Sequence, residues 1–328
     1  MRPISFVDAA TLPEAIAALS AGNGNARVIA GGSDLLGELK EGIATQSTLV
    51  DLSRIEGLKG IARTDASLRI GALTTIHALE TAGELAGPYQ MLAEAARSVA
   101  TPEVRNQGTL GGNLCQRPRC LHYRSALSPC FKKGSDDCPA VESEYQQYLS
   151  VMGGDRCFAV HPTDLGPPLI AYDATVAIEG PSGRREMALE SFFTGPEVDI
   201  TRETVLESGE VLTSVSIPAR SDGWRGVYTK GRERTAGDFA VVSVAVGFEV
   251  RDGRVRDCRI VLGGVAPSPM RSRRAEALVE GQMPSEPVAA SAAEAALADA
   301  QPLSHNAHKV QIARVLIERT ILRVASMA

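Results

Sequence analysis

The chain has 328 residues, of which 44% are hydrophobic, and a formal net charge of −5. This length allows two or three domains, each with its own core, and no run approaches the ~20 apolar residues that span a bilayer. The negative charge argues against nucleic acid or an anionic membrane as the main partner. Aromatic residues make up only 4%, so no platform for stacking bases is evident.

The first predicted helix and strand lead into a glycine turn. Thr11 to Glu14 form a capping box, which predicts a helix to about Ser20. A short strand, Arg27 to Ala30, then ends at Gly31-Gly32-Ser33-Asp34, and a second helix begins at Leu35. A strand, a glycine turn and a helix start together present backbone N–H groups that can hold a phosphate. A tight turn without any ligand is the alternative.

A second glycine-rich run, Asn106 to Asn113, follows strands predicted at Ser47 to Asp51 and Leu68 to Leu73 and a helix at Tyr89 to Val99. Neither G-x-G-x-x-G after a strand nor G-x-x-x-x-G-K-[ST] occurs, which argues against a Rossmann dinucleotide fold and a P-loop. What remains is two glycine turns, about 75 residues apart, within one α+β region.

Four cysteines stand within thirty-eight residues, whereas the other 290 positions hold only Cys115 and Cys258; the four are Cys120, Cys130, Cys138 and Cys157. The segment between them is polar and lacks apolar periodicity, so we expect a loop that a bound group ties down. An iron–sulfur cluster fits best, because cluster ligation sets no single spacing. Zinc stays open, although structural zinc sites usually contain C-x₂₋₄-C pairs. Disulfides or free thiols also stay open, although no export signal indicates an oxidising compartment.

The segment after the cysteines predicts more strands and then helices. Strands are expected at Thr175 to Glu179 and Val211 to Ile217, with a domain boundary at about Pro218 to Gly223. Beyond the boundary we expect a small antiparallel sheet and three helices, at Trp224 to Lys230, Phe239 to Val250, Val255 to Leu262, Ser272 to Glu280, Val288 to Ala300 and His305 to Ala325. The five histidines form no ligand or triad spacing, so no catalytic residue is expected, and His122 is interpreted as a loop histidine in water.

Several motifs in one order resemble the FAD-binding medium subunit of the molybdenum hydroxylases, the xanthine dehydrogenase and carbon monoxide dehydrogenase family. The motifs are Val28 to Leu35, Ile70 to Thr74, Gln107 to Asn113, the Asp164 segment and Tyr228 to Lys230. The cysteine segment resembles the [4Fe–4S] insertion of two branches, the aldehyde oxidoreductases and the 4-hydroxybenzoyl-CoA reductases. Its spacing is nearer to the aldehyde branch.

This resemblance implies an α+β fold. Residues 1–218 would form a PCMH-type FAD-binding domain of two α+β subdomains, with a [4Fe–4S] loop at about 115–160, and residues 224–328 the C-terminal domain. It implies that the cluster is held by the four cysteines of the loop and that Cys115 is not a ligand. It implies that FAD is held by Ile29, Ala30, Gly31, Gly32, Ser33, Asp34 and Leu35 at the pyrophosphate, by Thr109, Gly112 and Asn113, by Asp164 at hydroxyl groups, and by Lys230 near the flavin carbonyls.

The resemblance also implies partners and an activity. A large molybdopterin subunit would oxidise the substrate, a small subunit with two [2Fe–2S] clusters would relay electrons, and FAD on this chain would pass them to an external acceptor. The complex would be a heterotrimer or its dimer, cytoplasmic, or periplasmic if a partner carried an export signal. Three alternatives remain: a medium subunit of a 4-hydroxybenzoyl-CoA reductase, a stand-alone PCMH flavin reductase, and a non-enzymatic protein stapled by zinc.

Overall fold

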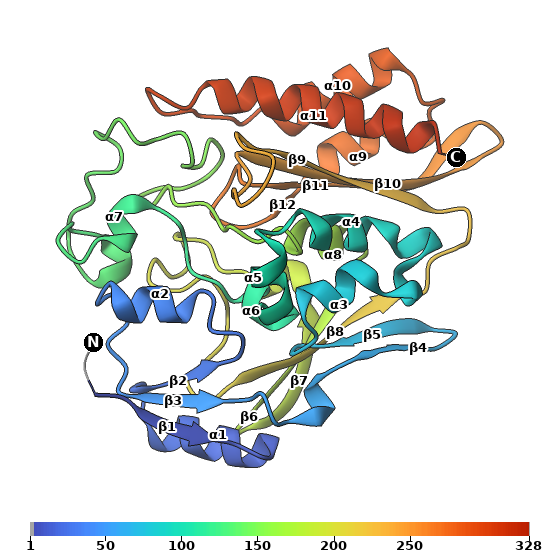
Figure 1. Cartoon of the computed structure of the whole chain (residues 1–328). Coiled ribbons are helices and arrows are strands. Elements are labelled where there is room, and N and C mark those ends of the chain that lie inside the picture. The colour runs from blue at the N-terminus through green and yellow to red at the C-terminus, as the bar shows by residue number, and fades with distance from the viewer. Residues whose placement is uncertain (1–2, 328) are drawn as a thin grey trace.

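The computed structural model describes residues 3–327 and arranges them around three β-sheets. The first sheet is parallel, in the order β1-β3-β2. Its strands and its two helices are β1 (Ser5–Asp8), β2 (Ala26–Ile29), β3 (Thr48–Asp51), α1 (Leu12–Ala21) and α2 (Leu35–Lys40). The capping box of α1 is present as predicted, because the Thr11 side chain accepts from the Glu14 backbone N–H. This unit lies at the bottom of Figure 1.

The second sheet is antiparallel and has five strands in the order β4-β5-β8-β6-β7. They are β4 (Ile61–Arg63), β5 (Ser67–Gly71), β6 (Thr175–Gly180), β7 (Gly183–Ala188) and β8 (Val211–Pro218). Helices of the same subdomain are α3 (Ile76–Thr81), α4 (Gln90–Ser98), α5 (Pro102–Gln107), α6 (Leu110–Leu114) and α8 (Gly166–Ala171). Short 3₁₀ turns lie at Glu56–Leu58, Gly83–Leu85, Gly87–Tyr89 and Leu189–Phe192. The side chains of Leu68, Leu92 and Val215 join these elements in one buried core.

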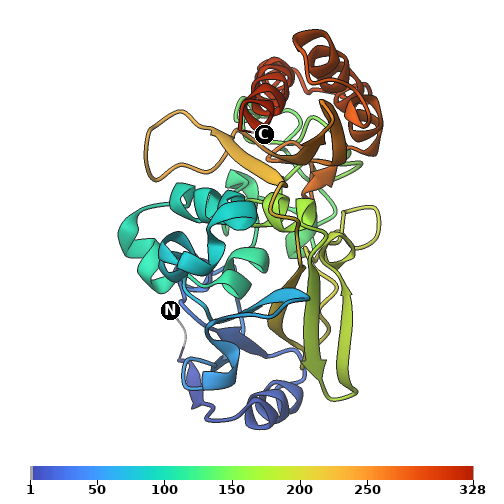
Figure 2. The ribbon, with the colours of Figure 1, turned by 90° about the vertical axis from the view of Figure 1, so that its right-hand side faces the viewer.

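The third sheet lies beyond the second and carries the last helices. Its order is β12-β11-β10-β9, and its elements are β9 (Arg225–Gly231), β10 (Val242–Arg251), β11 (Arg254–Gly263), β12 (Met270–Arg271), α9 (Arg273–Val279), α10 (Glu286–Ala296) and α11 (His308–Ala325). The buried face of α10 consists of alanines, which lets it pack closely on its neighbours. Turned by 90°, the ribbon shows the first two sheets in the lower half of the molecule and the third sheet with its helices at the top (Figure 2).

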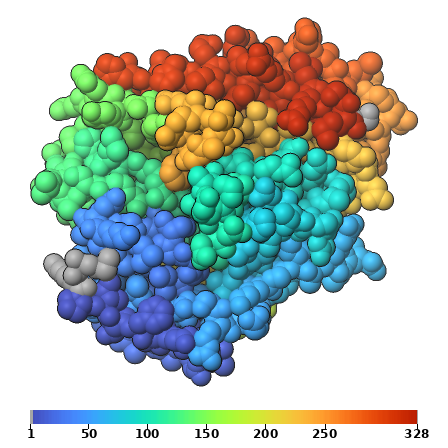
Figure 3. Space-filling view, viewed as in Figure 1, coloured from blue at the N-terminus to red at the C-terminus, as the bar shows by residue number. Residues whose placement is uncertain are grey.

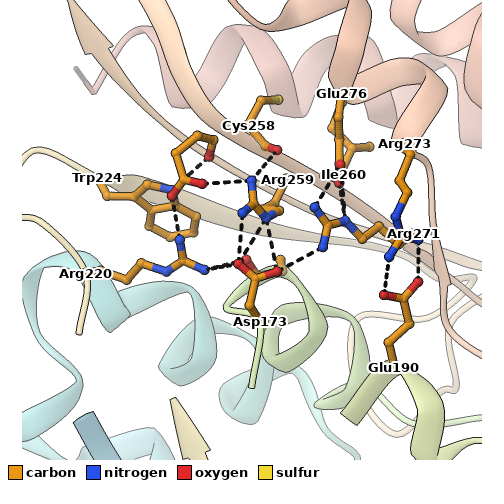
Figure 4. A network of polar contacts seen from close by, with 12 residues as sticks. Asp173, Glu190, Arg220, Trp224, Cys258, Arg259, Ile260, Arg271, Arg273 and Glu276 are labelled. Carbon is orange, nitrogen blue, oxygen red and sulfur yellow. Dashed lines mark hydrogen bonds and ion pairs between the residues drawn. The ribbon is translucent and has the colours of Figure 1, made fainter. Parts of the chain in front are cut away.

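A network of ion pairs joins the subdomain of the second sheet to the third sheet (Figure 4). Asp173, directly after α8, lies within 2.7, 3.0 and 2.9 Å of guanidinium nitrogens of Arg220, Arg259 and Arg271. Burial raises the pKa of Asp173, but hydrogen bonds and charges from Arg259 and Arg220 outweigh this and hold the pKa below its usual value. Because Arg259 and Arg271 belong to β11 and β12, this carboxylate fixes the C-terminal sheet to the flanking subdomain.

The cysteine segment contains little regular secondary structure. It contains only α7 (Leu121–Arg124) and a 3₁₀ turn at Phe131–Lys133. Its green surface occupies the left edge of Figure 3, between the blue N-terminal residues and the red C-terminal helices. At its far end, buried Lys309 of α11 donates to the carbonyl oxygens of Leu149 and Gly264, both at 2.6 Å. The loop is therefore tied to the C-terminal domain.

The predicted α+β fold class is confirmed, and most predicted elements lie within three residues of their observed bounds. Seven helices and strands were missed. They are β1, which is mostly exposed and shows no alternation, β4, β12 and α7, which have only two to four residues, and α5, α6 and α8, which are short and contain the helix-disfavouring residues proline or glycine. No helix within residues 3–327 is long and apolar enough to cross a membrane.

Candidate flavin and cluster sites

The two glycine turns meet in space, backbone against backbone. A Cβ atom built on Gly31 would lie 1.9 Å from the carbonyl oxygen of Gln107, at the start of the second turn. Gly32, the next residue, has a φ of 70°, a left-handed conformation that favours glycine. Only a residue without a side chain at position 31 therefore allows the turn after β2 to rest on the turn after α5.

A cavity of about 740 Å³ opens along these turns. Its wall contains all but one of the residues that the resemblance implies for FAD: Ile29, Ala30, Gly31, Gly32, Ser33, Asp34, Leu35, Thr109, Gly112, Asn113 and Asp164. The exception is Lys230, which does not line the cavity. Residues so far apart in sequence thus share one space large enough for an extended ligand.

Thr109 is the N-cap of α6, and Asn113 lies within that helix; hydrogen bonds hold both side chains in place. The Thr109 hydroxyl caps this helix by accepting from the Gly112 N–H at 3.1 Å, which leaves its own O–H free to donate. The Asn113 side-chain oxygen accepts from the Thr163 hydroxyl at 2.5 Å and from the Leu165 N–H at 3.3 Å. What Asn113 can offer a ligand is therefore its amide N–H₂ group.

Asp164 is a buried carboxylate with two strong partners. Its oxygens accept from the Tyr228 hydroxyl and from Lys230 Nζ, both at 2.7 Å. The side chains of Asp164 and Lys230 are only 4% and 3% exposed, and Lys230 also donates to the Ser98 carbonyl at 3.1 Å. Two lone-pair positions on the carboxylate remain for ligand hydroxyls. Lys230 does not line the cavity, so it acts on a ligand there through its ion pair with the Asp164 carboxylate.

Asp34 has a role that sequence reasoning missed. Its side chain makes no cap for α2; it accepts from the Arg117 N–H at 2.8 Å and pairs with Arg119 at 2.8 Å and Arg124 at 2.7 Å. Burial raises the pKa of this carboxyl, but the charges of Arg119 and Arg124 outweigh burial and hold the pKa below its usual value. The first glycine turn thus anchors the start of the cysteine segment.

Burial raises the pKa of three thiols in the cysteine segment. It raises the pKa of Cys120 to about 11, while the nearby backbone N–H groups of Tyr123 and His122 act to lower it. Burial likewise raises the pKa of Cys138 and Cys157, against N–H groups of Ala140 and Ala159. Such donors stabilise a thiolate and any metal–sulfur bond it makes.

The four cysteines are also close enough to affect one another. Negative charge on Cys130 raises the pKa of Cys120, Cys138 and Cys157, whereas Cys115 is not part of this group. All six cysteines of the chain are free thiols. Among residues 3–327, no three His, Cys, Asp or Glu side chains converge on a point where one metal ion could bind. Zinc needs that convergence, with Zn–S bonds of about 2.3 Å, but a cluster whose irons each take one thiolate does not.

A series of buried ion pairs connects the flavin cavity to the cysteine segment, and sequence reasoning also missed it. Glu203 lines the flavin cavity and pairs with Arg117 at 2.9 Å and with Lys132 at 2.7 Å. The Lys132 charge in turn lowers the pKa of Cys157, against burial, which raises it. The interpretation of His122 as a histidine in water is wrong, because its Nε2 is buried, while Nδ1 lies 2.9 Å from the Ser128 hydroxyl. No local pattern indicates the Glu203 contacts, because they join distant segments.

Comparison with known proteins gives the same assignment along the whole chain. Residues 2–220 match the family described as the FAD binding domain in molybdopterin dehydrogenase, and residues 227–324 match the CO dehydrogenase flavoprotein C-terminal domain. The aldehyde oxidoreductase FAD-binding subunit PaoB of Escherichia coli K12 is 35% identical over 307 residues, covering 92% of this chain and 91% of PaoB. The carbon monoxide dehydrogenase medium chain of Hydrogenophaga pseudoflava is 30% identical, covering 88% of this chain and 84% of that one.

Solved structures agree with the sequence comparison. Carbon monoxide dehydrogenase from Hydrogenophaga pseudoflava superposes with a TM-score of 0.80 at 28% identity, covering 99% of this chain and 98% of that one. Quinoline 2-oxidoreductase from Pseudomonas putida 86 gives 0.79 at 27% identity, covering 100% and 98%. The chain therefore belongs to the family of FAD-binding subunits of the molybdenum hydroxylases, whose characterised members are subunits of dehydrogenases and oxidoreductases.

Proposed function

We propose that this chain is the FAD-carrying electron-transfer subunit of a molybdenum-containing hydroxylase, assembled with a large molybdopterin subunit and a small [2Fe–2S] subunit. The single observation that carries the proposal is the backbone contact between Gly31 and Gln107, which makes the two glycine turns one continuous wall of a large cavity. When bound, FAD supplies a group that takes up electrons singly and releases them in pairs, which suits a junction between clusters and a two-electron acceptor. Residues 1–218 would hold FAD and residues 224–328 would form the C-terminal domain.

The side chains of the cavity suggest how FAD would be held. The backbone N–H groups from Ile29 to Leu35 would donate to the pyrophosphate, since each arginine that lines the cavity is already paired with a carboxylate: Arg27, Arg117, Arg119 and Arg202. Thr109 O–H and the Asn113 amide would donate to further polar atoms, and Asp164 would accept from hydroxyl groups of the cofactor. Lys230 would act by holding the Asp164 carboxylate in its orientation and by adding positive charge on the side of the ring that becomes negative on reduction.

The cysteine segment fits a [4Fe–4S] cluster. Cys130 lies within electrostatic range of Cys120, Cys138 and Cys157, and nearby backbone N–H groups act to lower the pKa of these three thiols, although burial raises it. Zinc is disfavoured because the four cysteines contain no C-x₂₋₄-C pair. An oxidoreductase of the aldehyde type is favoured because PaoB, an aldehyde oxidoreductase subunit, shares 35% identity over nearly all of both chains. A 4-hydroxybenzoyl-CoA reductase-type subunit is the second candidate.

The test is spectroscopic and analytical. The chain, purified anaerobically with the partner subunits, should show flavin absorption bands plus a broad iron–sulfur shoulder, with molybdenum in the intact complex. About four iron and four acid-labile sulfide atoms per chain are expected beyond those of the small subunit. A colourless protein without sulfide would contradict both cofactors. A yellow protein that never co-purifies with a molybdenum subunit would instead support a stand-alone flavin reductase.

Replacing one proposed ligand separates the two cofactors. Cys138→Ser should remove the cluster and disorder the loop while FAD content stays high, because Cys138 is only partly buried and lies outside the flavin cavity. Cys258→Ser is the matched control, since Cys258 is a free thiol on β11, far from the loop in sequence. If both variants keep the same iron and sulfide as the parent protein, Cys138 is not a ligand.

A further inference from the structure

A second cavity, of about 490 Å³, adjoins the flavin cavity. The two share five wall residues: Arg119, Pro162, Gly237, Asp238 and Phe239. The remaining wall comes from the cysteine loop, from the segment 159–163 and from the loop between β9 and β10. A molecule in the second cavity would therefore touch the wall that FAD touches from the other side.

This space is not that of the proposed cluster or of the proposed flavin contacts. Of the four clustered cysteines only Cys120 lines it, and of the predicted FAD contacts none does. The cavity instead lies where a ligand would be close to both redox groups, with Cys120 on one wall and the shared residues on the other. The proposed function assigns no occupant to it.

The chemistry of the wall favours a flat, uncharged molecule. Each of its three charged side chains is already paired, Arg119 with Asp34 at 2.8 Å and Arg234 with Asp238 at 2.7 Å. The guanidinium of Arg119 also stacks on the Phe239 ring, with its carbon 4.7 Å from the ring centre. Among the described residues, no cation in the wall remains to neutralise a phosphate, and the volume is well below that of the adjoining cavity proposed for a dinucleotide. Both facts argue against a nicotinamide dinucleotide here.

The other lining side chains suit an aromatic carbonyl compound. Apolar contact comes from Leu121, Leu149, Val160 and Phe239. Tyr145, Gln147 and Tyr148 bring hydroxyl and amide groups, which can donate hydrogen bonds to carbonyl oxygens. Tyr145 is 62% exposed and Leu121 57% exposed, so the opening reaches solvent and a ligand could exchange.

We propose that this cavity binds a small quinone, which serves as the electron acceptor of the FAD held next to it; the inference rests on the proposed FAD site. Two electrons and two protons convert the quinone into its hydroquinone. FAD, when bound and reduced, would supply both electrons and one proton and so become oxidised, and solvent would supply the second proton. The cysteine loop then has a second task, because it forms one wall of the acceptor site.

The test measures binding without electron transfer. Menadione is titrated into the full chain carrying oxidised FAD, with equilibrium dialysis as the readout, and FAD and iron contents are recorded beside it. Leu121→Trp should fill the cavity and weaken menadione binding on the order of tenfold, the size expected for losing one well-packed contact. Leu127→Trp is the matched control, because Leu127 lies on the same loop, is 96% exposed and does not line the cavity. Tyr145→Ala removes an exposed ring from the wall and tests the site without adding bulk.

The outcomes separate the two proposals. Saturable menadione binding that both cavity variants weaken, with FAD and iron contents unchanged and the Leu127→Trp control unaffected, supports the acceptor site. Binding that is absent, or equal in all variants, overturns it while the FAD proposal stands. Loss of FAD in Tyr145→Ala also overturns it, since the cavity would then belong to the flavin itself. A parent protein that carries no FAD refutes the proposed function instead.

Discussion

Gly31→Ala is the substitution that tests the flavin cavity most directly. The new Cβ would lie 1.9 Å from the Gln107 carbonyl oxygen and 2.6 Å from its carbon. To restore the ordinary contact distance of 3.4 Å, the two turns must separate by about 1.5 Å. Both sides of the contact are backbone, so no rotamer change can relieve it. Overpacking of this kind costs about 1–3 kcal/mol.

Because the strained contact forms the wall of the cavity, we expect the cost to appear in FAD binding. An energy of about 1–3 kcal/mol corresponds to roughly 5- to 150-fold weaker affinity. The assay is the dissociation constant of FAD, measured by flavin fluorescence on deflavinated and reloaded protein, with urea unfolding of the flavin-free protein measured in parallel. The expected result is weaker FAD binding that exceeds any loss of the stability of the flavin-free protein.

Gly57→Ala is the control for this experiment. A Cβ atom on Gly57 would meet no other atom within 4 Å among residues 3–327, and Gly57 does not need a left-handed backbone. Its replacement should therefore change stability by less than about 0.5 kcal/mol and leave FAD binding unchanged. If Gly31→Ala binds FAD as tightly as the parent protein, the two turns do not grip the cofactor together, and the wall they form is not the FAD site.

Three further predictions concern buried charges. Lys230→Met should destabilise the protein by about 3–5 kcal/mol in urea unfolding, because it leaves the Asp164 carboxylate buried without its cation. Adding Asp164→Asn to this variant should recover part of the lost stability. If it recovers none, Lys230 and Asp164 do not stabilise the protein as an ion pair. Asp173→Asn keeps a residue that tolerates the positive φ of 52° but removes the negative charge between three arginines. Proteolysis between β8 and β9 should therefore accelerate. Asp299→Asn is the control and should not change the rate of proteolysis, because Asp299 and its partner Arg274 have side chains that are 72% and 68% exposed. Burial lowers the pKa of Lys309 to about 7 from 10.5; the unfolded chain therefore binds more protons between these values, and unfolding free energy should rise with pH there, by at most about 1.4 kcal/mol per pH unit. In Lys309→Met this rise should be absent, and equal pH profiles for the two proteins would show that Lys309 does not titrate in this range.

The parts of the site that could be predicted from the sequence are those that local geometry dictates. A strand that stops at Gly31-Gly32 and a helix that starts at Leu35 imply a turn with free backbone N–H groups, and the structure has that turn in a cavity wall. The concentration of cysteines predicts a ligand set on chemical grounds, independently of the fold, and this stays a prediction.

The parts that could not be predicted depend on which distant segments meet. The contact between Gly31 and Gln107 needs two subdomains to be packed before it exists. The Asp34 carboxylate was expected to be one member of a turn, but its partners lie more than eighty residues later, at Arg117 and Arg124. The second cavity has walls from the cysteine segment, from residues 159–163 and from the loop between β9 and β10, and no local pattern indicates that these segments meet. Contacts between residues so far apart in the chain leave no periodic pattern in the sequence.

The pairing of β5 with β8 has a consequence for the order of synthesis. Gly71 lies opposite Ser214 in the middle sheet, so strands on either side of the cysteine segment become neighbours only after both have been made. A nascent chain that ends before residue 211 lacks the central strand of that sheet, although it already contains both glycine turns and all the clustered thiols. Loading of FAD, or of the proposed cluster, on the ribosome is therefore disfavoured, and insertion is expected only after the central strand has been made and the sheet has folded.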